Sequence, residues 1–131
     1  MRPVVLVTNG NAELCQIYSR FLAKRGYEVE TSTDGLDCLA KLRRLRPAAL
    51  VLDQELRWGG SDGVLACLRE ESQMPWVPVV LTTTASSSEL LSELLEPPVV
   101  QCLEQPFPLT ALLESVRTAQ PIRPISLAAH K

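Results

Sequence analysis

Five short apolar runs recur along the chain at similar intervals, at residues 4–7, 27–30, 48–52, 77–81 and 99–103. The first, third and fourth runs are continuously apolar and rich in valine or leucine, which is typical of parallel strands buried on both faces of a sheet. The second run alternates apolar and charged residues, so it predicts an edge strand with one face in water.

Five helices are expected between and after these runs, because apolar residues there recur at helical spacing. Helix by helix, these apolar positions are Leu14, Ile17, Tyr18, Phe21 and Leu22; Leu36, Leu39, Ala40 and Leu45; Val64, Leu65 and Leu68; Leu90, Leu91, Leu94 and Leu95; and Leu112, Leu113 and Val116. Asn11 predicts the N-cap of the first helix, Gly26 its C-terminal stop and Pro47 the end of the second. Asp62 marks the start of the third helix, and Pro108 suits the first turn of the last.

The alternation of strand and helix predicts a parallel sheet with helices on both faces. With right-handed crossovers, this is a doubly wound α/β domain. Ligands or chemistry in such a domain lie at the carboxyl ends of the strands, beside the topological switch point. This rule selects four segments as candidate site, at residues 8–11, 53–62, 82–85 and 105–106.

The chain of 131 residues has the length of one domain, which we place at residues 1–120, followed by a proline-containing tail at 121–131. Its net charge of −2 provides no field for a polyanion, so nucleic acid is not an expected partner. No apolar stretch approaches the roughly 20 residues that cross a bilayer. We therefore expect a cytoplasmic protein without a membrane partner.

Four cysteines, Cys15, Cys38, Cys67 and Cys102, are scattered along the chain, and the one histidine is His130. This spacing lacks both a zinc-site pattern and a Cys/His or Ser/His catalytic arrangement. We therefore expect no enzyme, and we interpret the cysteines as small buried apolar residues.

An aspartate, Asp53, follows the buried run at 48–52, and a carboxylate in that place can be a nucleophile, a metal ligand or a helix-cap acceptor. Hydroxyl residues follow the run at 77–81, and a proline-phenylalanine pair follows the run at 99–103. With this order of elements, the chain resembles the receiver domain of two-component response regulators as far as about Thr118. The matching segments are Leu50-Val51-Leu52-Asp53, Ser61-Asp62-Gly63, Pro78-Val79-Val80-Leu81-Thr82-Thr83 and Gln105-Pro106-Phe107.

The resemblance implies a flavodoxin-like fold with five parallel strands in the order 2-1-3-4-5. It makes Asp53 the phospho-acceptor position and Thr83 the hydroxyl that contacts the phosphoryl group; a one-residue slip in the alignment would give that role to Thr82. Gln105 stands at a second phosphoryl-contact position, where the family has a lysine. Cys102 stands at the switch position, where the family has an aromatic ring.

The resemblance also implies a Mg²⁺ site, for which the family provides two acidic residues after the first strand. Here these residues are Thr8 and Asn9. Because Mg²⁺ prefers anionic oxygens, Asp53 is the one clear anionic ligand, and Asn9 and the backbone carbonyl of Glu55 offer neutral oxygens. We expect Mg²⁺ to bind weakly, and we expect no other cofactor.

These departures predict an atypical receiver in phosphorelay signal transduction, acting mainly through protein–protein contacts, with weak or no phosphorylation at Asp53. The expected partner is a histidine kinase or a downstream effector. An ordinary Mg²⁺-dependent phospho-accepting receiver is the first alternative, because Asp53 and Thr83 are present. A small-molecule or phosphate binder that uses the turn at residues 8–11 is the second.

A partner surface is expected around Leu91 and Leu95, because the family's usual output face includes the corresponding helix. The helix also has more leucine than one buried stripe needs. We predict that this surface serves a homodimer or another partner. The alternative is that these leucines pack inside the domain.

Overall fold

The computed structural model describes residues 2–56, 60–84 and 96–119. In this part of the chain, five strands form one parallel sheet in the order β2-β1-β3-β4-β5, as the resemblance implies. The strands are β1 (Val4–Thr8), β2 (Glu28–Ser32), β3 (Ala49–Asp53), β4 (Val79–Thr83) and β5 (Val99–Glu104). The helices of the described part are α1 (Ala12–Ala23), α2 (Gly35–Leu45), α3 (Gly60–Glu70) and α5 (Leu109–Ala119).

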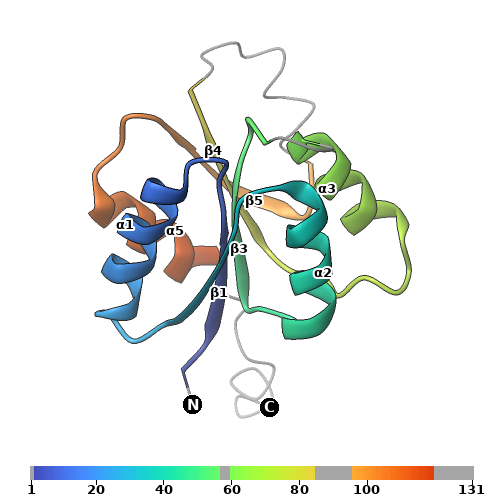
Figure 1. Cartoon of the computed structure of the whole chain (residues 1–131), viewed down its shortest axis with the longest axis horizontal. Helices are drawn as coiled ribbons and strands as arrows, with labels where there is room; N and C mark the ends of the chain where they lie inside the picture. The colour runs from blue at the N-terminus through green and yellow to red at the C-terminus, as the bar shows by residue number, and fades with distance from the viewer. Residues whose placement is uncertain (1, 57–59, 85–95, 120–131) are drawn as a thin grey trace, which may run out of the picture.

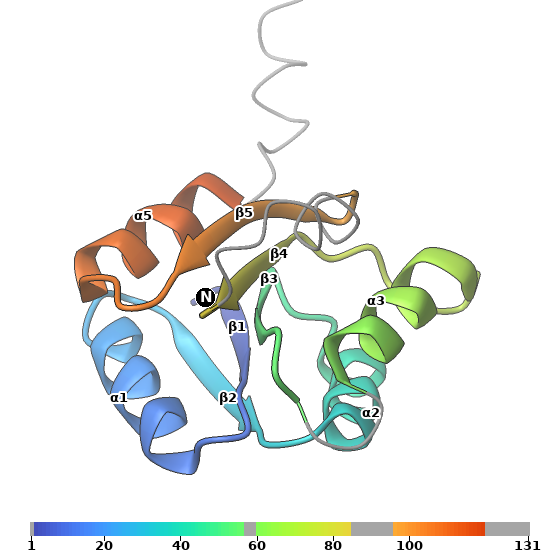
Figure 2. The same cartoon turned by 90° about the horizontal axis from the view of Figure 1, so that it is seen from above.

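Helices cover both faces of the sheet, with α1 and α5 on one face and α2 and α3 on the other (Figures 1 and 2). Successive residues of the buried strands contribute to opposite faces. In β1, Leu6 packs on the side of α2 and α3, and Val5 and Val7 pack on the side of α1 and α5. The continuously apolar runs are therefore core strands buried on both faces, and β2 lies at an edge, as predicted.

Most helix boundaries follow the local sequence signals. The side chain of Asn11 caps α1 by accepting hydrogen bonds from the backbone N–H groups of Glu13 and Leu14. Helix α2 ends before Pro47, as predicted. Helix α3, however, begins at Gly60, two residues before the predicted start at Asp62. The hydroxyl of Ser61 donates to the backbone carbonyl of Gln54 at 2.9 Å, a contact across the loop between β3 and α3.

Two apolar residues assigned to helical stripes prove to be exposed, Ile17 at 47% and Leu36 at 69%. In α2 the buried side chains are Cys38 and Leu42, which are one helical turn apart. Leu36 precedes Cys38 by two residues, or roughly 200° around the helix, so it faces away from the sheet.

The cysteine prediction is confirmed for Cys15 and Cys38, which are buried, whereas Cys67 and Cys102 are half-buried. All four thiols are free. Strand β4 extends two residues beyond the predicted run, through Thr82 and Thr83. Both threonines are buried because they pair with the ends of the neighbouring strands.

Three of the predicted features lie outside the described residues: the partner surface at Leu91 and Leu95, the helix that would carry it, and the tail at 121–131. Among the helices that the structure describes, none is long and apolar enough to cross a membrane.

Candidate functional site

The carboxyl ends of the strands bring the predicted site residues to one edge of the sheet. Asp53 ends β3 and lies opposite Thr82 of β4, and Thr83 lies opposite Glu104 at the end of β5. Gln105 follows β5 directly, and its backbone N–H donates to the carbonyl of Thr83 at 2.7 Å. The residues that the strand-end rule selected therefore lie together at one edge of the sheet.

The carboxylate of Asp53 is half-buried and accepts hydrogen bonds at both oxygens. Its Oδ1 accepts from Thr82 Oγ1 at 2.8 Å and from Gln105 Nε2 at a longer 3.5 Å. Its Oδ2 accepts from the backbone N–H of Glu55 at 3.2 Å. These three donors are all neutral groups.

Burial raises the pKa of the Asp53 carboxyl above its ordinary value, because removal from water penalises the charged form. The hydrogen bonds from Thr82 and from the Glu55 backbone lower this pKa, and the Glu55 carboxylate raises it, with a net upward shift. The ion pairs found among the described residues join Lys41 to Asp37, Arg43 to Glu71 and Arg117 to Glu114. No cation of the described part of the chain therefore pairs with Asp53 in this arrangement.

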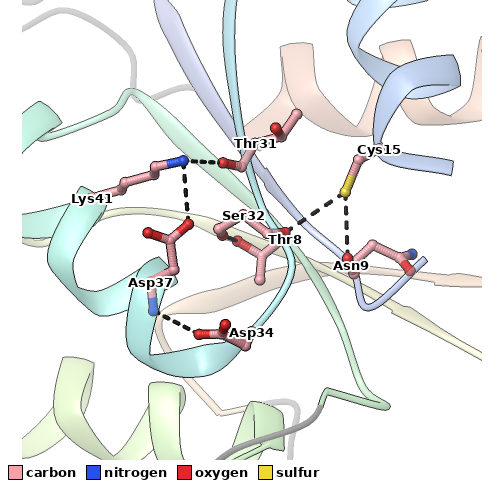
Figure 3. Close-up of polar contacts among 8 residues, drawn as sticks. All are labelled: Thr8, Asn9, Cys15, Thr31, Ser32, Asp34, Asp37 and Lys41. Atoms are coloured by element: carbon pink, nitrogen blue, oxygen red, sulfur yellow. Dashed lines mark hydrogen bonds and ion pairs between the residues drawn. The ribbon is translucent and has the colours of Figure 1, made fainter. Parts of the chain in front are cut away.

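Thr8 stands where the family would have its first acidic residue, and its hydroxyl contacts β2 instead (Figure 3). Thr8 Oγ1 lies 2.6 Å from Ser32 Oγ, and both residues are buried, at 1% and 3% exposure. Burial raises the pKa of the neighbouring Cys38 thiol to about 11, although side-chain hydrogen bonds with Thr8 and Ser32 lower it. These groups form a buried polar cluster between β1, β2 and α2, which we call the hydroxyl–thiol cluster.

Asn9 stands at the second acidic position and stabilises the turn into α1, because its Oδ1 accepts from the backbone N–H of Asn11 at 2.8 Å. Its carbonyl accepts from Cys15 Sγ at 3.4 Å (Figure 3). The same thiol lies 3.6 Å from the carbonyl of Ser32. The side-chain oxygen that would serve a metal therefore already has a donor.

The donors at this edge fit Mg²⁺ poorly. Asp53 supplies one carboxylate, and the carboxylate of Glu55 accepts from Thr84 Oγ1 at 3.3 Å. Among the residues that the structure describes, no group of three or more His, Cys, Asp or Glu side chains is arranged to hold a metal ion. Since Mg²⁺ sites are built from hard oxygens, preferably anionic ones, a single carboxylate whose oxygens already accept hydrogen bonds fits the ion poorly.

The structure separates the roles of two adjacent threonines. Thr82 donates to Asp53, whereas Thr83, the residue to which the resemblance gives the phosphoryl contact, donates to the side-chain oxygen of Gln54. Sequence reasoning missed Gln54, because its contact depends on the register that pairs Asp53 with Thr82, which only the structure shows. The phosphoryl contact of Thr83 stays a prediction.

Cys102, at the predicted switch position, lies in β5 opposite Leu81. Its side chain is half-buried and packs against the core on the side of α2 and α3. Burial raises the pKa of its thiol, with a further contribution from the Glu104 carboxylate. The small side chain therefore fills part of the core, and its role as a switch stays a prediction.

A shallow apolar groove of about 500 Å³ adjoins the site, between α1 and the segment that leads into α5. Gln105 and Thr84 connect the groove to the site, and the rings of Tyr18 and Phe107 stack with centroids 5.8 Å apart. The remaining lining residues are Leu14, Ile17, Pro106 and Leu109. The exposed Ile17 thus lines this groove, which the spacing of apolar residues in the helix did not predict.

Comparisons with known proteins agree with this geometry. Residues 5–117 match the family model of the response regulator receiver domain. The chain is 37% identical over 108 residues to a protein-glutamate methylesterase/protein-glutamine glutaminase of Anaeromyxobacter dehalogenans, which covers 81% of this chain and 30% of that protein. It is 32% identical to the response regulator MprA of Mycobacterium leprae, over 86% of this chain and 49% of that protein. The chain thus spans half or less of the length of these two relatives.

Solved structures give the same result. A chemotaxis response regulator of Vibrio cholerae is similar with a TM-score of 0.82 and 27% identity, over 91% of this chain and 99% of that one. A receiver domain of Francisella has the same fold, with a TM-score of 0.82 at 21% identity over 90% of this chain and 96% of that one. With the family match over most of its length, the sheet order and the strand-end aspartate, this chain belongs to the response regulator receiver domain family of two-component signalling.

Proposed function

We propose that this receiver acts mainly through protein–protein contacts in phosphorelay signal transduction, and that Asp53 is phosphorylated weakly or not at all. The observation that carries the proposal is the neutral environment of the Asp53 carboxylate, whose hydrogen-bond donors are Thr82, Gln105 and the backbone of Glu55. Phosphoryl transfer depends on cations that neutralise charge on the transferred group. Here the donors can orient the carboxylate, but they carry no positive charge.

The lack of a cation beside Asp53 in the described part of the chain would cost a phosphoryl-transfer reaction several kcal/mol. At an effective dielectric constant of about 20, one cation about 4 Å from an anion contributes about 4 kcal/mol. Gln105, at the position of the family's lysine, supplies a dipole in place of that charge. The Glu55 carboxylate raises the pKa of Asp53, so it adds negative potential where the phosphoryl group would arrive. Both effects oppose accumulation of a phosphorylated state.

The proposed partner is a histidine kinase or a downstream effector, working with this domain in the cytoplasm. The apolar groove supports a protein partner, because its exposed side chains adjoin the acceptor site and include the 47% exposed Ile17. The surface at Leu91 and Leu95 belongs to the same proposal, as a homodimer or partner contact. Both surfaces would allow recognition without a phosphoryl group.

The alternative of a phosphate binder at the turn of residues 8–11 receives little support from the local contacts. Anion sites at helix N-termini use free backbone N–H groups. In this turn the N–H of Asn11 donates to Asn9, and the N–H groups of Glu13 and Leu14 donate to the side chain of Asn11. The turn thus satisfies these donors with its own side chains.

Intact-mass spectrometry after incubation with Mg²⁺ and acetyl phosphate tests the proposal. The Asp53→Asn variant, treated in parallel, reports any modification at other residues. We expect the wild-type chain and this control to show the same small extent of modification. Substantial phosphoryl addition that is Mg²⁺-dependent and absent from Asp53→Asn would overturn the proposal in favour of an ordinary phospho-accepting receiver.

A further inference from the structure

Three consecutive threonines at the end of β4 donate hydrogen bonds to three consecutive residues at the end of β3. Thr82 Oγ1 lies 2.8 Å from Asp53 Oδ1, Thr83 Oγ1 donates to Gln54 Oε1, and Thr84 Oγ1 lies 3.3 Å from Glu55 Oε1. We call this set of contacts the threonine ladder; its members are Asp53, Gln54, Glu55, Thr82, Thr83 and Thr84. Each contact joins residues 29 apart in sequence, so the ladder is a contact between strand ends.

Main-chain hydrogen bonds reinforce the same junction. The backbone N–H of Gln54 donates to the carbonyl of Thr82 at 2.8 Å, which continues the pairing of β3 and β4 beyond the last strand residue. On the other side of β4, the N–H of Gln105 donates to the carbonyl of Thr83 at 2.7 Å. The end of β4 is therefore held by both of its neighbours.

The ladder acts on both faces of the sheet. Thr82 and Thr83 are consecutive strand residues, so their side chains point to opposite faces. Each of these two threonines is 1% exposed, and their contacts with Asp53 and Gln54 are part-buried, whereas Thr84 and Glu55 form an exposed contact. The difference matters because a hydrogen bond shielded from solvent competes less with water than an exposed one does.

One of the ladder contacts involves a group that a receiver site would need for a ligand. The hydroxyl of Thr83 is at the position to which the resemblance gives the phosphoryl contact, and it donates to Gln54. A second contact involves the carboxylate of Glu55, two residues after Asp53, which accepts from Thr84. Neither contact requires a cation or a phosphoryl group.

We propose that the threonine ladder holds the ends of β3 and β4 in one arrangement without a metal ion or a phosphoryl group, and that Gln54 is the positioning residue that holds Thr83. The inference rests on the proposed function, because a fixed site suits a receiver that is recognised without phosphorylation. In this arrangement Thr83 turns toward a phosphoryl group only when its contact with Gln54 breaks.

Amide hydrogen exchange, followed by NMR, tests the ladder in Gln54→Met and Gln54→Glu variants of the full chain. The methionine keeps the length of the side chain without the accepting oxygen, and the glutamate keeps that oxygen. We expect the amides of Thr83 and of Gln105, whose N–H donates to the Thr83 carbonyl, to exchange about tenfold faster in Gln54→Met than in the wild type. Gln54→Glu should retain most of the wild-type protection.

The matched control is Gln73→Met, at an exposed position after α3, which should leave these amides unchanged. Equal protection of Thr83 and Gln105 in the wild type, Gln54→Met and Gln73→Met would overturn the proposal. If Gln54→Met does not fold, Thr84→Ala removes the exposed contact alone, and unchanged protection of the Glu55 amide, which donates to Asp53, would then count against the ladder. Amide exchange is measured without phosphorylation. If Asp53 is phosphorylated and the exchange pattern is still the expected one, the proposed function is refuted and the proposal of the threonine ladder is supported.

Discussion

The buried pair of hydroxyls at Thr8 and Ser32 gives a prediction with a defined size. Thr8→Val keeps the shape of the side chain and removes the hydroxyl that lies 2.6 Å from Ser32 Oγ. Ser32 is 3% exposed, so it gains little access to water when its partner is lost. A buried polar group without its partner costs about 1–3 kcal/mol, and Cys38 loses a contact as well. We expect the free energy of unfolding to fall by about 2 kcal/mol.

A double-mutant cycle separates this hydrogen bond from simple packing. Adding Ser32→Ala to Thr8→Val removes the group that was left without its partner, so the double variant should lose less stability than the sum of the single variants. The expected coupling is about 1 kcal/mol. Urea unfolding followed by tryptophan fluorescence measures each free energy, and each 1 kcal/mol corresponds to about 4 °C in melting temperature for a domain of this size. Additive losses, or a Thr8→Val variant as stable as the wild type, would refute this account of the hydroxyl–thiol cluster.

The same site makes a sharper prediction for Thr8→Asp, which restores the family's acid at a position with 1% exposure. Burial disfavours the charged form, so the folded pKa of the new carboxyl should lie above its unfolded value. The variant should therefore approach wild-type stability at acidic pH and lose stability as pH rises from the ordinary aspartate pKa through the folded one. Near neutral pH we expect a loss of several kcal/mol, partly reversed by Mg²⁺ if the ion binds the folded state. A Thr8→Asp variant whose urea midpoint matches the wild type across this pH range would contradict the argument.

Three further predictions concern charge and surface. Because the pKa of Asp53 is raised in the folded state, its charged form lowers the folding stability at pH values above the ordinary aspartate pKa. The stability of Asp53→Asn relative to the wild type should therefore rise as pH increases from the ordinary aspartate pKa through the folded one. Urea titrations at several pH values measure this difference, and a difference that does not change with pH would contradict the prediction. Mg²⁺ titration followed by tryptophan fluorescence should show no saturation at millimolar concentrations. Tight, saturable binding that Asp53→Asn abolishes would contradict the conclusion that the residues at this edge fit Mg²⁺ poorly. Charge substitution such as Leu91→Glu should change the sedimentation of the chain with little change in melting temperature; an earlier melt with unchanged sedimentation would place Leu91 in the core.

The strands were predictable because their signal is local. Runs such as the one that became β3 (Ala49–Asp53) are apolar on both faces, and this property of neighbouring residues needs no knowledge of the rest of the fold. Helix faces were less predictable. Leu36 has the right spacing for a buried position, but Cys38 and Leu42 face the sheet, because the orientation of the whole helix is decided by its best-packed stripe.

The sequence predicted which strand-end residues lie together and which of them are uncharged. The strand-end rule placed Asp53, Thr82 and Gln105 at one edge, and the sequence alone shows that residues 8, 9 and 105 carry no charge. The partner of each hydroxyl was not predictable. Which of two adjacent threonines reaches Asp53 depends on the register of β3 against β4, and a shift of one residue moves every side chain to the other face.

The register of β3 against β4 explains how the Asp53 carboxylate is held by neutral hydrogen-bond donors. Among the described residues no cation pairs with Asp53, so each oxygen of this half-buried carboxylate needs another donor to offset its lost hydration. Thr82 and the Glu55 backbone supply these donors from the two strand ends that the threonine ladder joins. Neutral residues at positions 8, 9 and 105 and the hydrogen bonds between the strand ends are therefore two parts of one arrangement, in which neutral donors hold the Asp53 carboxylate.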